Sequence, residues 1–128
     1  MSLNNLEINN VISLKPLERY KYFIKKVADF EELWVLLDSK GNHALSCLED
    51  KTFISIWSHY PYLKTCLNDE WSKFFPTKIT LDDFESNVID YMEDDYLLNI
   101  FPVNNKSGFI VTLKEFIRDL NDELDKYA

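Results

Sequence analysis

Strand-like and helix-like segments follow one another irregularly along this chain, and their order limits the fold more than any other feature. The apolar spacing predicts helices over residues 16–28, from 58 to about 71, 81–94 and 113–124, and strands over 33–37, 43–48, 52–57, 74–79, 97–101 and 109–111. The order is αβββαβαββα. A doubly wound parallel sheet needs regular alternation of strand and helix. We therefore expect an α+β fold, with a mainly antiparallel sheet flanked by helices.

Local signals support several of these elements. The apolar run Leu33–Leu37 is short and continuous, which favours a strand covered on both faces, and we expect residues 33–57 to form a three-stranded meander. The runs at 97–101 and 109–111 flank a turn-rich link and should pair antiparallel. Thr80 begins a capping-box-like helix start, and Thr112 with Glu115 forms a capping box.

The first twelve residues differ in composition from the rest of the chain. Four of them are asparagines and their apolar spacing is weak, so we expect residues 1–12 to be a loosely ordered arm. Residues 13–128 should form a single domain. With 46% apolar residues, this domain can offset the conformational entropy of folding by burial, without a metal or disulfide.

The charge balance indicates which partners to expect. Fourteen basic against 22 acidic residues give a net charge of −8, which repels nucleic acid and favours basic protein surfaces. The N-terminal residues lack a basic and an apolar region, and no apolar stretch approaches the ~18 residues that span a bilayer. We therefore expect a cytoplasmic protein that binds neither nucleic acid nor membranes.

Residue types that carry catalysis or hold cofactors are scarce. Gly41 and Gly108 are the only glycines, and each falls in a predicted turn. Glycine-rich phosphate-binding loops need several glycines close together, so the sequence contains none and no cofactor is expected. The two histidines and two cysteines, His43, His59, Cys47 and Cys66, have no metal-binding spacing, so no metal site is predicted. Both cysteines are expected to be buried thiols. A Cys66–His59 dyad is conceivable, but no catalytic residue is assigned.

The best candidate for a recognition surface is an aromatic strand-to-helix junction. Trp57, His59, Tyr60 and Tyr62 follow one another there, and exposed rings beside an imidazole could line a shallow groove.

A second, weaker candidate is acidic. Glu93, Asp94 and Asp95 sit at the end of a predicted helix, where negative charge is unfavourable to the helix dipole. A locally unfavourable charge of this kind can mark a binding site, although a structural loop explains it as well.

Several stretches resemble a bacterial family, domain of unknown function 2750, from about Arg19 to Leu124. They are residues 19–28, 33–37, 81–84 and 100–102, and Trp57-Ser-His59 together with Cys66. The resemblance implies a compact α+β bacterial protein without an assigned activity, so it transfers no catalytic or binding residue. Tyr62 and Leu63 depart from it, because a small residue is common at this point in the family, and a groove there could be reshaped.

Three functions remain as hypotheses. The first is a non-enzymatic protein-interaction domain, immunity-like or regulatory, that binds a basic surface. The alternative is a small-molecule-binding protein or enzyme that uses an aromatic and histidine groove around residues 57–62. Self-association through the strand at 33–37 or an edge near Phe74 is the third.

Overall fold

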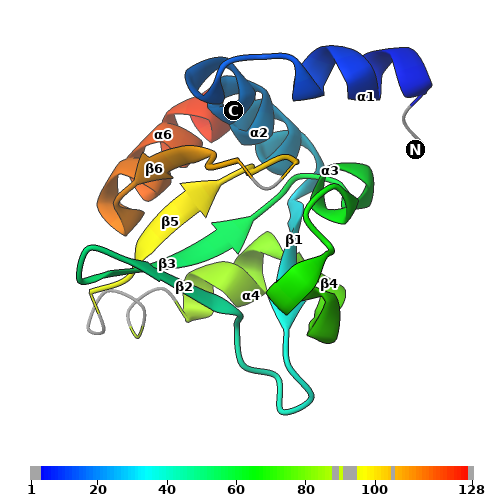
Figure 1. The fold of residues 1–128 in the computed structure, drawn as a ribbon. Helices are drawn as coiled ribbons and strands as arrows, with labels where there is room; N and C mark the ends of the chain where they lie inside the picture. Colours follow the sequence, from blue (N-terminus) through cyan, green and yellow to red (C-terminus); the bar gives the residue numbers. More distant parts are fainter. Residues whose placement is uncertain (1–3, 88–89, 91–94, 105, 127–128) are drawn as a thin grey trace.

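Figure 1 shows the fold in a computed structural model, which describes residues 4–87, 90, 95–104 and 106–126. The helices are α1 Asn5–Ile12, α2 Pro16–Phe30, α3 Tyr60–Lys64, the 3₁₀ helix η1 Asp69–Lys73, α4 Leu81–Ser86 and α6 Leu113–Asp125. The strands are β1 Glu32–Leu37, β2 Leu45–Leu48, β3 Lys51–Ile56, β4 Phe75–Thr80, β5 Leu97–Ile100 and β6 Phe109–Val111. The predicted α+β class, with a mainly antiparallel arrangement and flanking helices, is confirmed.

The strands form two sheets. One has four strands in the order β2-β3-β5-β6, in which β3 and β5 run parallel and the other pairs are antiparallel. The predicted antiparallel pairing of the last two strands is thus confirmed. The second sheet is the antiparallel pair β1-β4. It joins the first through backbone hydrogen bonds between Trp34 and Trp57, with N···O distances of 2.7 and 3.0 Å.

The expected three-stranded meander is wrong in one respect. β2 and β3 form the predicted hairpin, but β1 pairs along its whole length with β4, from Glu32 opposite Thr80 to Leu37 opposite Phe75. β1 touches the start of the hairpin only near His43, where Ala44 N–H donates to the Leu36 carbonyl at 2.9 Å. A strand as apolar as β1 can satisfy its backbone against either neighbour, so local pattern does not decide the pairing.

Helices cover one face of the four-stranded sheet. Strand residues that share this inner face, such as Ile54 and Leu98, are buried. Three helices meet over them: the Phe116 ring of α6 lies 5.9 Å from that of Phe23 in α2 and 5.8 Å from that of Phe84 in α4, measured between centroids. The opposite face is turned to the viewer in Figure 1, and no helix lies in front of β3 and β5 there.

The N-terminal segment, expected as a loosely ordered arm, contains the helix α1. Asn4 caps it by accepting a hydrogen bond from the Glu7 amide at 2.8 Å, and Val11 is buried in the core. Glu7 also accepts a hydrogen bond from the Tyr22 hydroxyl of α2 at 2.7 Å. The asparagine-rich composition therefore did not reveal a helix that is capped at its N-terminus and hydrogen-bonded to α2.

The helix expected from Ser58 to about Trp71 is interrupted. α3 ends at Lys64, and the chain turns through Cys66 before continuing as η1. The interruption brings the Trp71 ring edge-on to that of Trp57, with centroids 5.9 Å apart. This tertiary contact explains why the apolar stripe does not continue as one helix.

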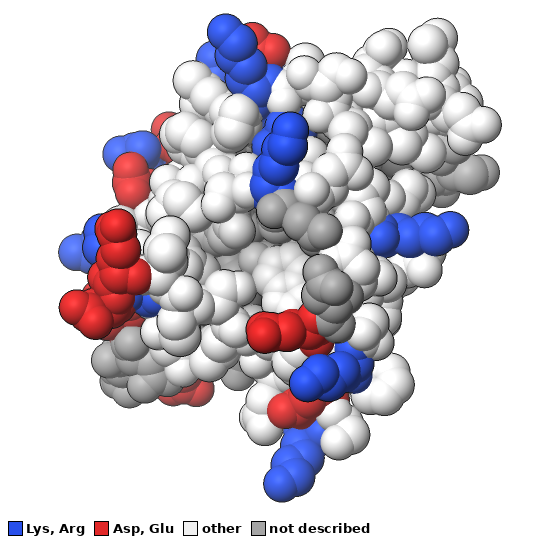
Figure 2. All heavy atoms as spheres, in the orientation of Figure 1, with Lys and Arg blue, Asp and Glu red and all other residues white. Residues whose placement is uncertain are grey.

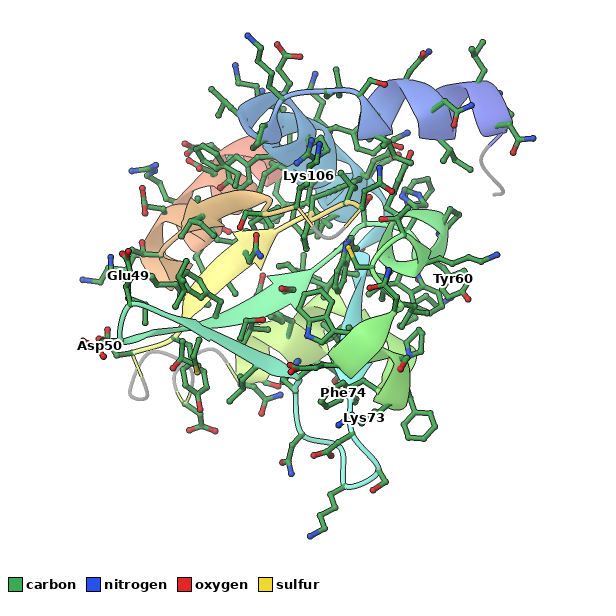
Figure 3. The ribbon with its side chains drawn as sticks, viewed as in Figure 1. Glu49, Asp50, Tyr60, Lys73, Phe74 and Lys106 are labelled. Atoms are coloured by element: carbon green, nitrogen blue, oxygen red, sulfur yellow. The ribbon has the colours of Figure 1, made fainter. Side chains whose placement is uncertain are left out.

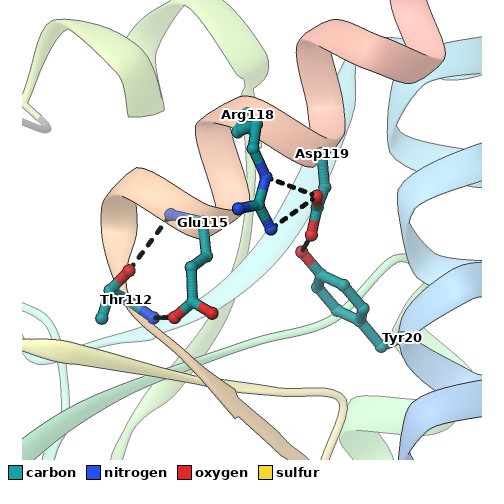
Figure 4. A network of polar contacts seen from close by, with 5 residues as sticks. All are labelled: Tyr20, Thr112, Glu115, Arg118 and Asp119. Carbon is teal, nitrogen blue, oxygen red and sulfur yellow. Dashed lines mark hydrogen bonds and ion pairs between the residues drawn. The ribbon is translucent and has the colours of Figure 1, made fainter.

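Both predicted helix starts are confirmed. Thr80 accepts from the Asp83 amide at 3.1 Å, and Thr112 and Glu115 form the reciprocal capping box drawn in Figure 4. Only residues 81–86 of the helix predicted over 81–94 form α4, and part of the remainder lies outside the described residues. Within the described chain, no helix has both the length and the apolarity to cross a membrane.

Candidate functional site

The predicted recognition junction is largely part of the core. Trp57 and Tyr62 are fully buried, so the expected pair of exposed rings does not form. The Trp57 indole N–H donates to the Pro102 carbonyl at 2.7 Å, and the Tyr62 ring lies 4.6 Å from that of Phe101. These side chains connect α3 and β3 to the segment after β5, which explains why this stretch is aromatic.

His59 and Tyr60 are the parts of the junction that reach the surface. His59 is half-buried with the rings of Tyr22, Phe30 and Tyr62 about it, at centroid distances of 6.5, 6.0 and 6.0 Å. Burial lowers the pKa of His59 from its ordinary value, and the nearby positive charge of Lys26 lowers it further. The imidazole is therefore held neutral near pH 7.

A short hydrogen-bond chain borders this histidine. The Tyr22 hydroxyl donates to Glu7, and because each hydroxyl has one proton, Tyr62 must donate to Tyr22 across their 3.0 Å contact. Burial is the main cause that raises the pKa of both tyrosines. The chain thus orders α1, α2 and α3 without an ionised tyrosine.

Of the second predicted site, the structure describes Asp95. Glu93 and Asp94 lie outside the described residues. Asp95 is an exposed turn residue just before β5, with a positive φ of 59°.

The cysteines differ from each other. Cys66 is buried and donates through its thiol to the Pro102 carbonyl at 3.4 Å, whereas Cys47 on β2 is exposed, contrary to the expectation of two buried thiols. β2 is an end strand, and this exposes side chains that a central strand would bury. Both thiols are free, and in the part of the chain the structure describes no three His, Cys, Asp or Glu side chains are grouped as metal ligands.

A groove that the sequence did not predict lies on the uncovered face of the four-stranded sheet. Its volume is about 610 Å³. Figure 2 looks onto this face: charged side chains lie mainly toward its margin, and the middle is hollowed. We call it the sheet groove, and it is lined by Ser46, Cys47, Leu48, Phe53, Cys66, Asn68, Glu70, Trp71, Asn99, Pro102, Lys106, Ser107 and Ile110.

The floor of the sheet groove follows from strand register. Phe53, Asn99 and Ile110 lie on the outer face, because Ser55 is opposite Asn99 and Asn99 is opposite Ile110. Ser55 shares this face and is only 6% exposed, and its hydroxyl has no hydrogen-bond partner among the described residues. The alternation of residues 53, 55 and 57 was visible in the sequence, but which face stays open was not.

One wall of the groove is the connection between β5 and β6, which is held in a strained shape. Phe101 is fully buried and has a φ of 64°, a left-handed conformation that costs a non-glycine residue roughly 1–2 kcal/mol. Gly108 is needed for close approach, because a Cβ there would lie 1.8 Å from the Ile100 carbonyl oxygen. Its role is therefore not the positive φ expected of a turn glycine.

Arg19 braces the same connection from α2. Its side chain is almost fully buried, and its guanidinium donates to the carbonyl oxygens of Phe101 at 3.2 Å, Ser107 at 3.5 Å and Leu14. Burial lowers the pKa of Arg19 from its ordinary value. A planar group with several fixed donors suits such an array of carbonyls, and the wall is thereby pre-formed.

A neutral amide and two opposite charges enter the groove from different elements. Asn99 accepts from the Gly108 amide through Oδ1 at 2.8 Å, which leaves its NH₂ group as the donor end. Lys106 comes from the β5–β6 connection, as Figure 3 shows, and Glu70 comes from η1. The groove can therefore contact an apolar group on its floor while making hydrogen bonds at its walls.

Two other cavities are less distinctive. One of about 520 Å³ has His43, Asp83 and Asp90 around an apolar floor. The other, about 410 Å³, lies between α2 and α6 beside Tyr20, whose hydroxyl donates to Asp119 at 2.6 Å in the network of Figure 4. None of the three cavities is lined by a residue from 57–62.

Fold and groove together define a small α+β domain whose four-stranded sheet has helices on one face and an open groove on the other. No curated protein matches the chain. A family model, described as "Protein of unknown function (DUF2750)", matches residues 20–120. The chain belongs to this family, which confirms the resemblance found in the sequence, and the matched region includes every residue that lines the sheet groove.

Proposed function

We propose that this protein is a non-enzymatic interaction protein that binds a segment of a partner protein in the sheet groove. The observation that carries the proposal is the open apolar floor beside a braced wall. Ile110 is 42% exposed and Leu48 65% exposed, and Phe53 and Trp71 lie beside them. Aromatic and aliphatic pockets of this kind take the anchor residues that dominate binding energy.

The groove has the size and polarity for such an anchor. Its volume of about 610 Å³ falls within the range of sites that hold small ligands, so it can take a few side chains. The Asn99 NH₂ group, whose Oδ1 accepts from Gly108, offers hydrogen bonds to a partner backbone. The lining residues include Cys47 and Cys66 but no histidine, which supports binding without a nucleophile-base pair.

Charge favours a basic partner. The net charge of −8 attracts cationic surfaces at long range, and Glu70 in the wall offers a local contact. Glu49 and Asp50 project at the tip of the β2–β3 hairpin, as Figure 3 shows. Lys106 is the opposing charge in the groove, and changing it tests directly whether the bound partner is basic or acidic.

Capture of a partner from the native host tests the proposal. Ile110→Asp places a charge on the groove floor and should abolish capture, whereas Leu17→Asp alters a similarly exposed leucine on α2 and should not. Both variants should melt as the unmodified protein does. Equal capture by the two variants would contradict the proposal.

A matched pair of charge reversals then tests the sign of the partner's charge. With a basic partner, Glu70→Lys should weaken binding and Lys106→Glu should strengthen it, and both effects should shrink as salt is raised. Isothermal titration with the captured partner measures this. The opposite order would show that the bound segment is acidic.

The small-molecule alternative rests on His59. Its neutral imidazole with three aromatic rings about it is a setting that can stack with a flat ligand. A thermal-shift screen of metabolites tests this, with His59→Gln as the control, because Trp57 and Tyr62 are core residues whose loss would unfold the domain. A ligand whose shift survives in His59→Gln does not use this site.

A further inference from the structure

The free edge of β2 offers a second kind of contact: β2 also borders the sheet groove through Ser46, Cys47 and Leu48, but its edge would bind through backbone groups. In the strand order β2-β3-β5-β6, β2 is an end strand, and the described residues place no strand beyond it. Leu45 and Leu48 are 44% and 65% exposed, and Cys47 is exposed as well. A strand with this much apolar surface at an edge is a template for pairing with another chain.

The hairpin turn shows which backbone groups of β2 face outward. Glu49 and Asp50 both have positive φ, 51° and 67°, which is the two-residue turn that closes on a hydrogen-bonded pair, here Leu48 opposite Lys51. Pairs alternate along an antiparallel ladder, so Ser46 is bonded to β3. The N–H and C=O groups of Leu45 and Cys47 therefore point away from β3.

Other edges of the two sheets are less suited to pairing. β4 includes Pro76, which has no N–H, and Lys78, and both are devices that discourage edge pairing. β6 is only three residues long. β1, which the sequence suggested for self-association, pairs along its length with β4. The run Leu45–Leu48 carries no charge, proline or glycine.

We propose that two copies of this chain associate through antiparallel pairing of β2 with β2, with Ser46 of one copy opposite Ser46 of the other. In this register Leu45 of each copy exchanges backbone hydrogen bonds with Cys47 of the other, so all the outward groups are used. Leu48 then lies beside Ala44 of the other copy. The two four-stranded sheets become one continuous sheet.

Charge permits this contact although each copy carries −8. The paired edges are uncharged, and the acidic tip at Glu49 and Asp50 of one copy extends toward the turn of the other copy that contains Asp38 and Lys40. Asp38 and Lys40 balance each other in this turn, so the segment facing each hairpin tip carries no net charge. A twofold axis through Ser46 makes both ends of the contact equivalent.

The oligomeric state is measured first, by sedimentation velocity across a wide range of concentrations. The protein should shift from monomer to dimer, and Cys47→Pro should remain monomeric because it lacks an outward N–H, while Cys47→Val should still dimerise. A monomer at every concentration would overturn the proposal, as would a dimer that tolerates proline at this position. Either result would leave the groove proposal intact.

Disulfide trapping tests the register without relying on stability. Ser46→Cys in a Cys47→Ser background puts two thiols in a non-hydrogen-bonded pair, with Cα atoms about 4.5 Å apart, within the range that a disulfide spans. Mild oxidation should link the copies. Leu48→Cys in the same background separates the thiols by four residues along the strand, roughly 13 Å, and should not link. Linking through residue 48, or none through residue 46, would overturn the register.

Discussion

Replacing Gly108 with alanine should destabilise the protein severely. The added Cβ would lie 1.8 Å from the Ile100 carbonyl oxygen and 2.8 Å from the Phe101 carbonyl carbon, both backbone atoms that cannot rotate away. Relief requires the start of β6 to move from the end of β5. That movement breaks the hydrogen bond from the Gly108 amide to Asn99 at 2.8 Å and disturbs the one from Arg19 to Phe101.

The loss of stability expected for Gly108→Ala follows from these contacts. Two hydrogen bonds contribute about 1 kcal/mol each, and overpacking a fixed core typically costs about 1–3 kcal/mol more. We therefore expect the free energy of unfolding to fall by ~3–5 kcal/mol, a large part of the ~5–15 kcal/mol of a typical domain.

Gly41→Ala is the matched control. Gly41 has a φ of 84° and no atom within 4 Å of its ideal Cβ, so only backbone strain of about 1–2 kcal/mol is expected. Urea titrations of both variants and the unmodified protein, with equal m-values, provide the comparison. A loss in Gly108→Ala no greater than that in Gly41→Ala would refute the claim that residues 100 and 108 are in forced contact.

Three further predictions concern stability. Arg19→Met should cost ~2–4 kcal/mol in urea unfolding, since carbonyls such as that of Phe101 lose a buried partner, and Arg19→Lys should not restore it because an ammonium lacks the planar fork. Thr112→Ala should cost about 1 kcal/mol by removing the cap of α6, which the same titration measures; an unchanged midpoint would mean that the capping box contributes little. Because the folded pKa of His59 is depressed below 6.5, the unfolded chain takes up the proton more readily, and stability should fall as pH drops below about 6.5. His59→Gln should reduce that slope between pH 7 and 5, while His43, whose pKa burial also lowers, retains part of it; an identical slope would contradict this assignment.

Elements with a local signal were predicted correctly. The caps at Thr80 and Thr112 depend on residues three apart, and the β2–β3 hairpin depends on adjacent runs. The β1–β4 pairing was missed because residues 32–37 and 75–80 are far apart in sequence, and nothing local ranks β4 above β2 as a neighbour. The interrupted helix before η1 was missed for a similar reason, because the Trp57–Trp71 contact forms only in the folded protein.

The exposure of Trp57 and Tyr62 in the recognition junction was misjudged, because aromatic residues near a turn resemble an exposed patch in sequence. In the fold, Trp57 donates to a carbonyl of the β5–β6 connection, so an apparent recognition residue supports a wall of the sheet groove instead. The groove itself combines four strands, η1 and two connecting segments, the one before η1 and the one between β5 and β6. Its floor residues, such as Phe53 and Ile110, alternate in the way predicted for strands, but a pattern of period two does not reveal which face a helix will cover.

Two energetic costs in this domain lie beside the groove. Phe101 has a left-handed backbone beside one wall, and the Ser55 hydroxyl is buried below the floor with no hydrogen-bond partner in the described part of the chain, at a cost of about 1–3 kcal/mol. An alanine at position 55 would avoid the second cost without changing the strand. Strain and unsatisfied groups persist in proteins mainly where they serve binding or catalysis. The position of these two residues beside the groove therefore agrees with the proposal that the groove binds a partner, and this argument is independent of the apolar floor.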